Sequence, residues 1–348
     1  MHTFQIDGLG CDLRVIRFEG HEGLSRLFQF EIDVASPIGD LDHEDVVGKP
    51  ALLCFRAGDE LRRVHGIVES FEQGDESKKL TAYRAVLVPS VFRLRYRRDS
   101  RIFQALSVPD ILKKSLQAAG VPADGYRLSL SESYAPREYC VQYRESDWAF
   151  LCRLMESEGL SYHFEHDDTA DVLVITDSSS FYAPIAGEAT VPFRASLGAL
   201  MKDEHVSRFR YGKRIRPGKV TLRDYNFKKP SLLLEGEEQA SLDGDLEIYD
   251  YPGDYESPSP GKALARLRLE ELQASRQTAE GESACARFVP GATFTLADHP
   301  RDDYNRELLI TRVDHHGAEP GMEGTAGAAP YGNRFQAIPK EIPFRPAL

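Results

Sequence analysis

The residues of this sequence that could bind a metal ion are most concentrated in one short segment, His163-Phe-Glu165-His166-Asp167-Asp168. Imidazole and carboxylate groups are the side chains that zinc sites use. On a strand, His163 and Glu165 would share one face, while His166 would point to the other. We therefore interpret the segment as a polar strand face that runs into an acidic turn. A metal-dependent enzyme that uses His163, Glu165 and His166 stays open as an alternative.

Other candidates for catalysis are weaker. Gly281-Glu-Ser283-Ala-Cys285 is close to a G-x-S-x-G nucleophile elbow, but Cys285 replaces the last glycine and the segment follows a predicted helix. His315-His316 lies at a predicted strand end, without the H-E-x-x-H spacing or a nearby third ligand. Neither common glycine-rich phosphate-binding loop occurs. The sequence thus predicts no catalytic, cofactor-binding or metal-binding residue, and we expect that the chain is not an enzyme.

The five cysteines have no C-x-x-C spacing, which argues against a zinc ribbon or a thioredoxin-like motif. A disulfide framework is not expected in a long chain without a visible export signal. We predict reduced, mostly buried thiols. The cysteines are Cys11, Cys54, Cys140, Cys152 and Cys285.

Charge excludes some kinds of partner. The 43 Lys/Arg and 55 Asp/Glu residues give a net charge of −12, which argues against general nucleic-acid binding. We interpret the basic run between residues 93 and 101 as one face of a strand that meets solvent or a partner, with contact to nucleic-acid phosphates as the alternative. Its members are Arg93, Arg95, Arg97, Arg98 and Arg101.

Two neighbouring segments carry opposite charge. Residues 201–229 hold ten Lys/Arg against three Asp/Glu, and residues 231–256 hold nine Asp/Glu and no Lys/Arg. Solvated strand edges and loops would explain this pattern. The alternative hypothesis is that the two segments pair, within one chain or between chains of an assembly.

The length of 348 residues suggests two or three domains. No stretch without Asp, Glu, Lys or Arg exceeds ten residues, so no transmembrane helix is predicted. The N-terminus lacks a basic start followed by an apolar run, so no signal peptide is visible.

Alternating apolar and polar residues predict mainly β structure in three regions. We expect a first β-barrel at 1–104 and a small α/β module at 105–177, with helices near 108–119 and 146–158. We expect a second β-barrel region at 178–348, with a helix near 260–276. The Gly- and Ala-rich residues 317–332 are expected to form a mobile loop. We assign Trp148, Leu151 and Met155, on one helical face, to the core.

The segment ESDWAFLCRLMESEGLSYHFEH at residues 145–166 resembles the signature of VgrG proteins, the spike of bacterial type VI secretion systems. Further segments fit the same family in the same order, so the resemblance covers essentially the whole chain. They are residues 18–36, 47–55, 65–73, 83–104, 137–147, 249–255, 264–274, 299–313 and 333–339.

The resemblance implies a fold similar to the baseplate hub of contractile phage tails. Two related β-barrels per chain, with α/β elements between them, would trimerise into a ring with pseudo-sixfold symmetry. That ring would cap the hexameric tube protein Hcp and carry effectors outward when the sheath contracts. Contacts with baseplate components are also implied.

The resemblance further implies assembly in the bacterial cytoplasm and secretion without a signal peptide. Full-length relatives continue into an OB-fold and a β-helix needle that carries a PAAR tip. The sequence ends with PFRPAL (343–348) where the OB-fold would begin, so we expect a fragment or a hub-only protein. The alternative of the same lineage is the hub of a contractile phage tail or of a phage-derived particle.

Overall fold

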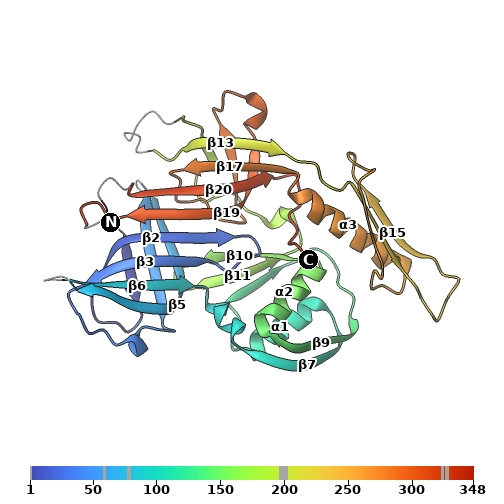
Figure 1. Cartoon of the computed structure of the whole chain (residues 1–348), viewed down its shortest axis with the longest axis horizontal. Helices are drawn as coiled ribbons and strands as arrows, with labels where there is room; N and C mark the ends of the chain where they lie inside the picture. Colours follow the sequence, from blue (N-terminus) through green and yellow to red (C-terminus); the bar gives the residue numbers. More distant parts are fainter. Residues whose placement is uncertain (1, 58–59, 77–79, 196–202, 323–324, 326–328) are drawn as a thin grey trace.

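A computed structural model describes residues 2–57, 60–76, 80–195, 203–322, 325 and 329–348 (Figure 1). Its largest feature is one long, mostly antiparallel sheet, in which the strands of two barrels lie side by side. A helical module and a smaller three-stranded sheet are attached at one end of this long sheet (Figure 1). The predicted mainly β fold with α/β elements between two barrels is confirmed.

Six strands in the order β1-β4-β5-β6-β3-β2 form the first barrel, and pairing of β1 with β2 closes it. Alternate residues point inward, as in β2, where Leu13, Val15 and Phe18 are buried and the residues between them are more exposed. The strand bounds are β1 Thr3–Ile6, β2 Leu13–Gly23, β3 Gln29–Ser36, β4 Pro50–Ala57, β5 Glu60–Glu76 and β6 Thr81–Val88.

The second barrel has the strand order β12-β18-β19-β20-β17-β13. A single bridge between Phe193 and Val206 joins β12 to β13 and closes the circle. Its core contains the packed rings of Phe288, Phe294 and Phe335. The strand bounds are β12 Thr190–Pro192, β13 Val206–Lys213, β17 Gln277–Ser283, β18 Thr293–Ala297, β19 Glu307–Ala318 and β20 Tyr331–Pro339.

The chain between the barrels forms the α/β module. The predicted helices are present as α1, Val108–Ala118, and α2, Asp147–Ser157. Ser107 and Ser146 cap their N-termini by accepting hydrogen bonds from the amides of Asp110 and Ala149. The strands are β7 Arg98–Leu106, β8 Tyr126–Ser129, β9 Arg137–Ser146, β10 Ser161–His166 and β11 Asp171–Thr176.

Core packing confirms the assignment of Trp148, Leu151 and Met155, which are all buried. Gly120 and Gly159, just beyond the two helices, adopt positive φ angles of 82° and 67°, a conformation that glycine tolerates best. β7 pairs only with β9 among the described strands. The division of the chain at residues 104 and 177 stays a prediction.

An insertion between β13 and β17 forms the smaller sheet, which we call the outer insert (residues 214–276). Its strands are β14 Lys219–Asp224, β15 Leu234–Gln239 and β16 Glu247–Asp250, in the order β15-β14-β16. Helix α3, Pro258–Ala274, covers one face and lies two residues earlier than predicted at both ends. No helix within the described residues combines the length and the apolar character that a membrane crossing requires.

Two local predictions are wrong. Arg93 and Arg95 do not lie on a strand, because Ser90–Arg95 forms a 3₁₀ helix, so the arginines do not line one strand face. The loop predicted at 317–332 is shorter, because its first two and last two residues belong to β19 and β20. Within it, the buried hydroxyl of Thr325 donates to the carbonyls of Glu319 and Met322. Residues 323–324 and 326–328 lie outside the described residues.

The other short 3₁₀ helices are His43–Asp45, Ser179–Phe181 and Asp302–Tyr304.

Candidate functional site: the open edges of the long sheet

The histidine cluster at β10 is arranged as the strand period predicts. His163 and Glu165 share a face, with His163 Nε2 and Glu165 Oε1 3.6 Å apart. Arg127 of β8 also pairs with Glu165, at 2.5 Å. Strand β8, which lies beyond β11 in this sheet, thus supplies an arginine to the carboxylate.

His166 points to the opposite side, where its Nδ1 accepts a hydrogen bond of 3.1 Å from the backbone N–H of His65. Burial and the nearby charge of Arg62 lower the pKa of His166 to about 3, so its imidazole is neutral. Across the described ranges, no group of three or more His, Cys, Asp or Glu side chains is placed to hold a metal ion.

The serine segment has no geometry for catalysis. Ser283 ends β17 as a buried residue, and its hydroxyl accepts a hydrogen bond from the backbone N–H of Cys285. Burial raises the pKa of the Cys285 thiol to about 12, which leaves it protonated at neutral pH. All five cysteines are free thiols, but only Cys140 and Cys285 are buried, so the prediction of mostly buried thiols is wrong.

His315 belongs to a buried polar network that the sequence did not reveal. Its Nε2 lies 2.8 Å from Glu22 Oε2, and its Nδ1 lies 2.8 Å from the hydroxyl of Tyr331. Arg62 donates to both oxygens of Glu22, at 3.0 and 3.2 Å. Since Glu22 lies on β2, Arg62 on β5 and His315 on β19, the network ties the second barrel to the first.

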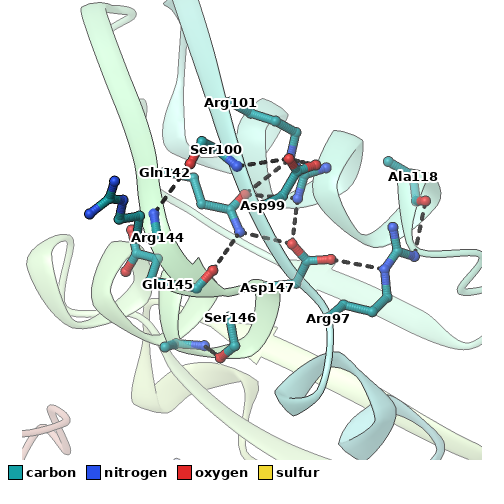
Figure 2. Close-up of polar contacts among 11 residues, drawn as sticks. Arg97, Asp99, Ser100, Arg101, Ala118, Gln142, Arg144, Glu145, Ser146 and Asp147 are labelled. Carbon is teal, nitrogen blue, oxygen red and sulfur yellow. Dashed lines mark hydrogen bonds and ion pairs between the residues drawn. The ribbon is translucent and has the colours of Figure 1, made fainter.

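The family-like segment ESDWAF has a structural role at the start of α2. Figure 2 shows the carboxylate of Asp147 between Arg97, Arg101 and Gln142. Arg101 approaches it to 2.6 Å and Gln142 to 2.8 Å, although Asp147 itself is only 1% exposed. These contacts fasten β7 and β9 to the N-terminus of α2, where a carboxylate is also favoured by the helix dipole.

The two barrels share one plan. Strands β2, β3, β4, β5 and β6 correspond in chain order to β13, β17, β18, β19 and β20, because their neighbours in the sheet are the same. Only the closing strand differs: β1 runs antiparallel to β4, whereas β12 runs parallel to β18. The outer insert therefore interrupts the second copy of the repeated unit, and the α/β module lies between the two copies.

Irregularities in strand pairing fix this correspondence to the residue. The β2–β3 register shifts between Val15 and Arg17, and the β13–β17 register shifts between Val206 and Arg208. Likewise, a shift before Ser70 in β5 corresponds to a shift before Arg312 in β19. Bulges are specific features of a strand pair, so their recurrence indicates equivalent positions.

Ion pairs on the outer face of the sheet recur at the same positions. Asp33 of β3 pairs with an arginine of each neighbouring strand, at 2.6 and 2.8 Å. Glu282 of β17 does the same at 3.3 and 3.5 Å. The arginines are Arg17 and Arg84 in the first barrel and Arg208 and Arg334 in the second.

One seam joins the barrels. Residues 17–23 of β2 pair antiparallel with residues 312–318 of β19, from Arg17 opposite Ala318 to Gly23 opposite Arg312. On the outer face of this seam, His21 Nδ1 and Asp314 Oδ1 lie 2.7 Å apart. β19 can accept β2 because β18 covers only the first part of its edge.

The strands equivalent to β19 and β2 of the seam are β5 and β13. Each of them has an edge that is not paired with a described strand along part of its length. β5 pairs with β4 only up to Ile67, so in the described structure residues 69–76 meet no strand on that side. β13 meets Phe193 only through Val206, and beyond this bridge its outer edge is likewise open among the described strands.

The two open edges carry opposite charge. Residues 69–76, which we call the acidic edge, contain four acidic residues and no basic one. Residues 208–214, which we call the basic edge, contain four basic residues and no acidic one. Of these, Arg210, Lys213 and Arg214 form no ion pair with any described carboxylate. The members are Glu69, Glu72, Asp75 and Glu76, and Arg208, Arg210, Lys213 and Arg214.

The predicted pairing of segments 201–229 and 231–256 is present in part within the chain. Lys219 contacts Glu237 and Glu247 at 3.0 and 3.4 Å, and Arg223 contacts Glu235 at 3.4 Å. These contacts use the part of the basic segment on β14, and none of them involves the part on β13. The acidic edge was not predicted from the sequence, in which its only signal is a run of four carboxylates in eight residues.

The chain is similar to known proteins of phage tails and of type VI secretion systems. The family described as phage tail baseplate hub (GPD) matches residues 21–321. The type VI secretion system spike protein VgrG4b of Pseudomonas aeruginosa is 39% identical over 99% of this chain and 44% of its own length. The chain thus spans less than half of that relative.

Solved structures share the fold. The E. coli c3393 protein, a type VI secretion component described as similar to the phage T4 tail proteins gp27 and gp5, has a TM-score of 0.76 at 23% identity. That match covers 99% of this chain and 80% of the other. The 43 kDa tail protein of prophage MuSo2 from Shewanella oneidensis has a TM-score of 0.67 at 12% identity, covering 98% and 99%. The chain belongs to the phage tail baseplate hub family, and the relatives that it resembles over almost its whole length include VgrG spike proteins of type VI secretion systems.

Proposed function

We propose that this chain is the structural hub of a type VI secretion spike and that three copies form a pseudo-sixfold ring. The observation that carries the proposal is the repeated barrel with its internal seam. Two barrels joined by β2 and β19 leave one acidic and one basic strand edge, and a second copy offers the complement of each. A head-to-tail interface of this kind closes into a ring when the rotation fits.

The correspondence between barrels sets the register between copies. In the internal seam, Arg312 lies opposite Gly23 and His315 opposite Gly20. The equivalent residues place Ser70–Gln73 of one copy antiparallel to residues 211–214 of the next, with Glu72 opposite Gly212. Pairing there satisfies the open backbone groups of both edges, which would otherwise invite uncontrolled association.

Such a ring has six similar barrels, which matches the symmetry of a hexameric Hcp-like tube. We propose that it caps that tube, contacts baseplate components, and carries effectors out when the sheath contracts. A PAAR tip would be reached only through a needle outside this sequence. Assembly in the bacterial cytoplasm and export by contraction belong to the same proposal.

No catalysis is part of this function. His163, Glu165 and His166 serve in contacts with neighbouring strands, which supports a structural role for the segment. The chain's part in delivery is then to match symmetry and to hold partners. The phage tail-hub alternative has the support of the shared fold with the MuSo2 tail protein, and flanking sheath or capsid genes would separate the two.

Cysteine cross-linking tests the ring directly. Residues directly opposite in an antiparallel pair have Cα atoms about 4.5–5.5 Å apart, within disulfide range. A Cβ at Gly212 meets no atom within 4 Å, so Gly212→Cys is tolerated. We expect Glu72→Cys with Gly212→Cys to give a covalent trimer on mild oxidation, with the trimer mass confirmed by light scattering.

A matched control combines Gly212→Cys with Glu31→Cys, since Glu31 is exposed on an inner strand of the same sheet. This pair should not cross-link. Trimers that form without the Glu72–Gly212 disulfide would show that another surface joins the copies.

A further inference from the structure

Strands β7 and β9 form a two-stranded ribbon in the α/β module. One face of the ribbon packs on the helices of the module, and its other, apolar face is uncovered. Its inner face carries Phe103 and Cys140, which pack on the first core. On the outer face Ile102 lies opposite Val141. The large side chains of this face are 43–67% exposed, and they are Ile102, Tyr139, Val141 and Tyr143.

A second uncovered group lies at the far end of the outer insert, where β14 and β16 end. α3 covers the other side of the sheet at Leu222 and Leu234, so it does not reach these side chains. The aromatic residues of this tip are 56–75% exposed, and they are Tyr225, Phe227, Tyr249 and Tyr251. Exposed apolar groups of this size usually mark interaction surfaces.

The two surfaces lie at the same end of the long sheet. Six successive antiparallel pairings connect β6 to β13, so both strands run in one direction. The helical module follows β6 and the outer insert follows β13. Figure 1 shows the ribbon on the side of β5, and the insert beyond the ends of β13 and β17.

Their surroundings carry complementary charge. Residues 93–104 and 137–146, which contain the ribbon, hold seven Arg and three Asp/Glu. Residues 231–256, which contain β15 and β16 of the insert, hold nine Asp/Glu and no Lys/Arg, although Lys228 and Lys229 lie at the tip. Exposed charges around the apolar groups include Arg98 and Arg144 on the ribbon and Asp250 and Glu256 on the insert.

We propose that the tip of the outer insert docks on the outer face of the β7–β9 ribbon of the next copy. This inference rests on the proposed ring, because joining β13 to the next copy's β5 brings the insert to the side where that ribbon lies. Apolar side chains form the centre of the contact, and the acidic and basic surroundings set its orientation. In the ring, this contact lies outside the pairing of β13 with β5 and forms a second interface between the same two copies.

Photo-cross-linking identifies the occupant. Benzoylphenylalanine replaces Val141 in the chain that also carries the Glu72→Cys and Gly212→Cys pair, and equal amounts of unlabelled and ¹⁵N-labelled chains are mixed. We expect cross-links that join the two isotopes and end within residues 223–256. The control places the same probe at Phe181, an exposed ring outside both surfaces, and should not reach that range.

Substitution supplies a second measurement. Val141→Asp, on a side chain that makes no core contact, should raise the dissociation constant of the trimer on the order of tenfold. Phe181→Asp should leave it unchanged, and circular dichroism checks that both variants fold.

The outcomes separate the two proposals. A seam disulfide together with Val141 cross-links to the neighbour's residues 223–256 supports the docking. A seam disulfide with cross-links elsewhere, or with an unchanged dissociation constant for Val141→Asp, overturns the docking and leaves the ring intact. Absence of the seam disulfide and of trimers overturns the ring and the docking together.

Discussion

Glu22 and His315, 293 residues apart in the chain, lie 2.8 Å apart in the buried interior where β2 meets β19. The imidazole of His315 lies between this carboxylate and the hydroxyl of Tyr331, with one ring nitrogen 2.8 Å from each of them. Glu22 is also the partner of Arg62, so one buried carboxylate holds together strands of both barrels.

Removal of this charge should destabilise the fold. In Glu22→Gln, Arg62 and His315 stay buried without an anionic partner, and breaking a buried pair costs about 3 kcal/mol or more. Urea denaturation measures the loss in the free energy of unfolding. The matched control is Asp314→Asn, which removes the exposed partner of His21 on the same seam and should cost less than about 1 kcal/mol. Equal losses in both variants would contradict a special role for the buried pair.

The same carboxylate predicts a dependence of stability on pH. Burial alone would raise the pKa of Glu22, but Arg62 and His315 outweigh it and lower the value to about 2. Since this folded-state pKa lies below the ordinary 4.5, the contribution is present above pH 4.5 and is lost as the pH falls toward 2. Thermal melting between pH 6 and 3 should show a smaller fall in Tm for Glu22→Gln than for the parent chain.

Asp147 should be essential for fastening the ribbon to α2. Asp147→Asn keeps the shape but removes the charge that Arg97 and Arg101 share, at a cost of about 2 kcal/mol. Glu145→Gln is the control, because its pair with Arg153 is half-exposed and should contribute less than about 1 kcal/mol. Chemical denaturation compares the two. A larger loss for Glu145→Gln would show that the buried carboxylate is not the main anchor.

Charge reversal tests the strand edges. Arg210→Glu with Lys213→Glu on the basic edge should dissociate the trimer, and Glu72→Lys with Glu76→Lys should do the same. A mixture of the two variants should restore one mixed interface, seen by light scattering as hetero-oligomers.

Salt at 1 M shortens the screening length to about 3 Å and should weaken the parent trimer. Lys113→Glu with Lys114→Glu, at exposed positions of α1 outside both proposed interfaces, is the control for net charge. A trimer that persists at 1 M salt and after charge reversal at both edges would contradict the proposed interface between the acidic and basic edges.

The histidine segment should not hold a metal ion. Elemental analysis of the purified chain should find no stoichiometric metal, and the amount should not change in His163→Ala with His166→Ala. One metal per chain that disappears in this variant would revive the enzymatic alternative.

The sequence by itself determined the local elements. Ser107 and Ser146 start the first two helices because a hydroxyl oxygen caps the free amides, and Gly120 and Gly159 follow their ends. Alternation with period two likewise identified most strands and placed His163 and His166 on opposite faces. Segment order along the chain was enough for the family.

The tertiary structure decided which strand edges are covered. Lys219 and Arg210 belong to one basic segment, yet Lys219 is paired on β14 and Arg210 remains on an open edge. The sequence likewise gives no sign that Glu22 and His315 are in contact. Strand partners and registers are set by contacts between residues far apart in the chain, and a local pattern contains no information about which distant edge completes a sheet.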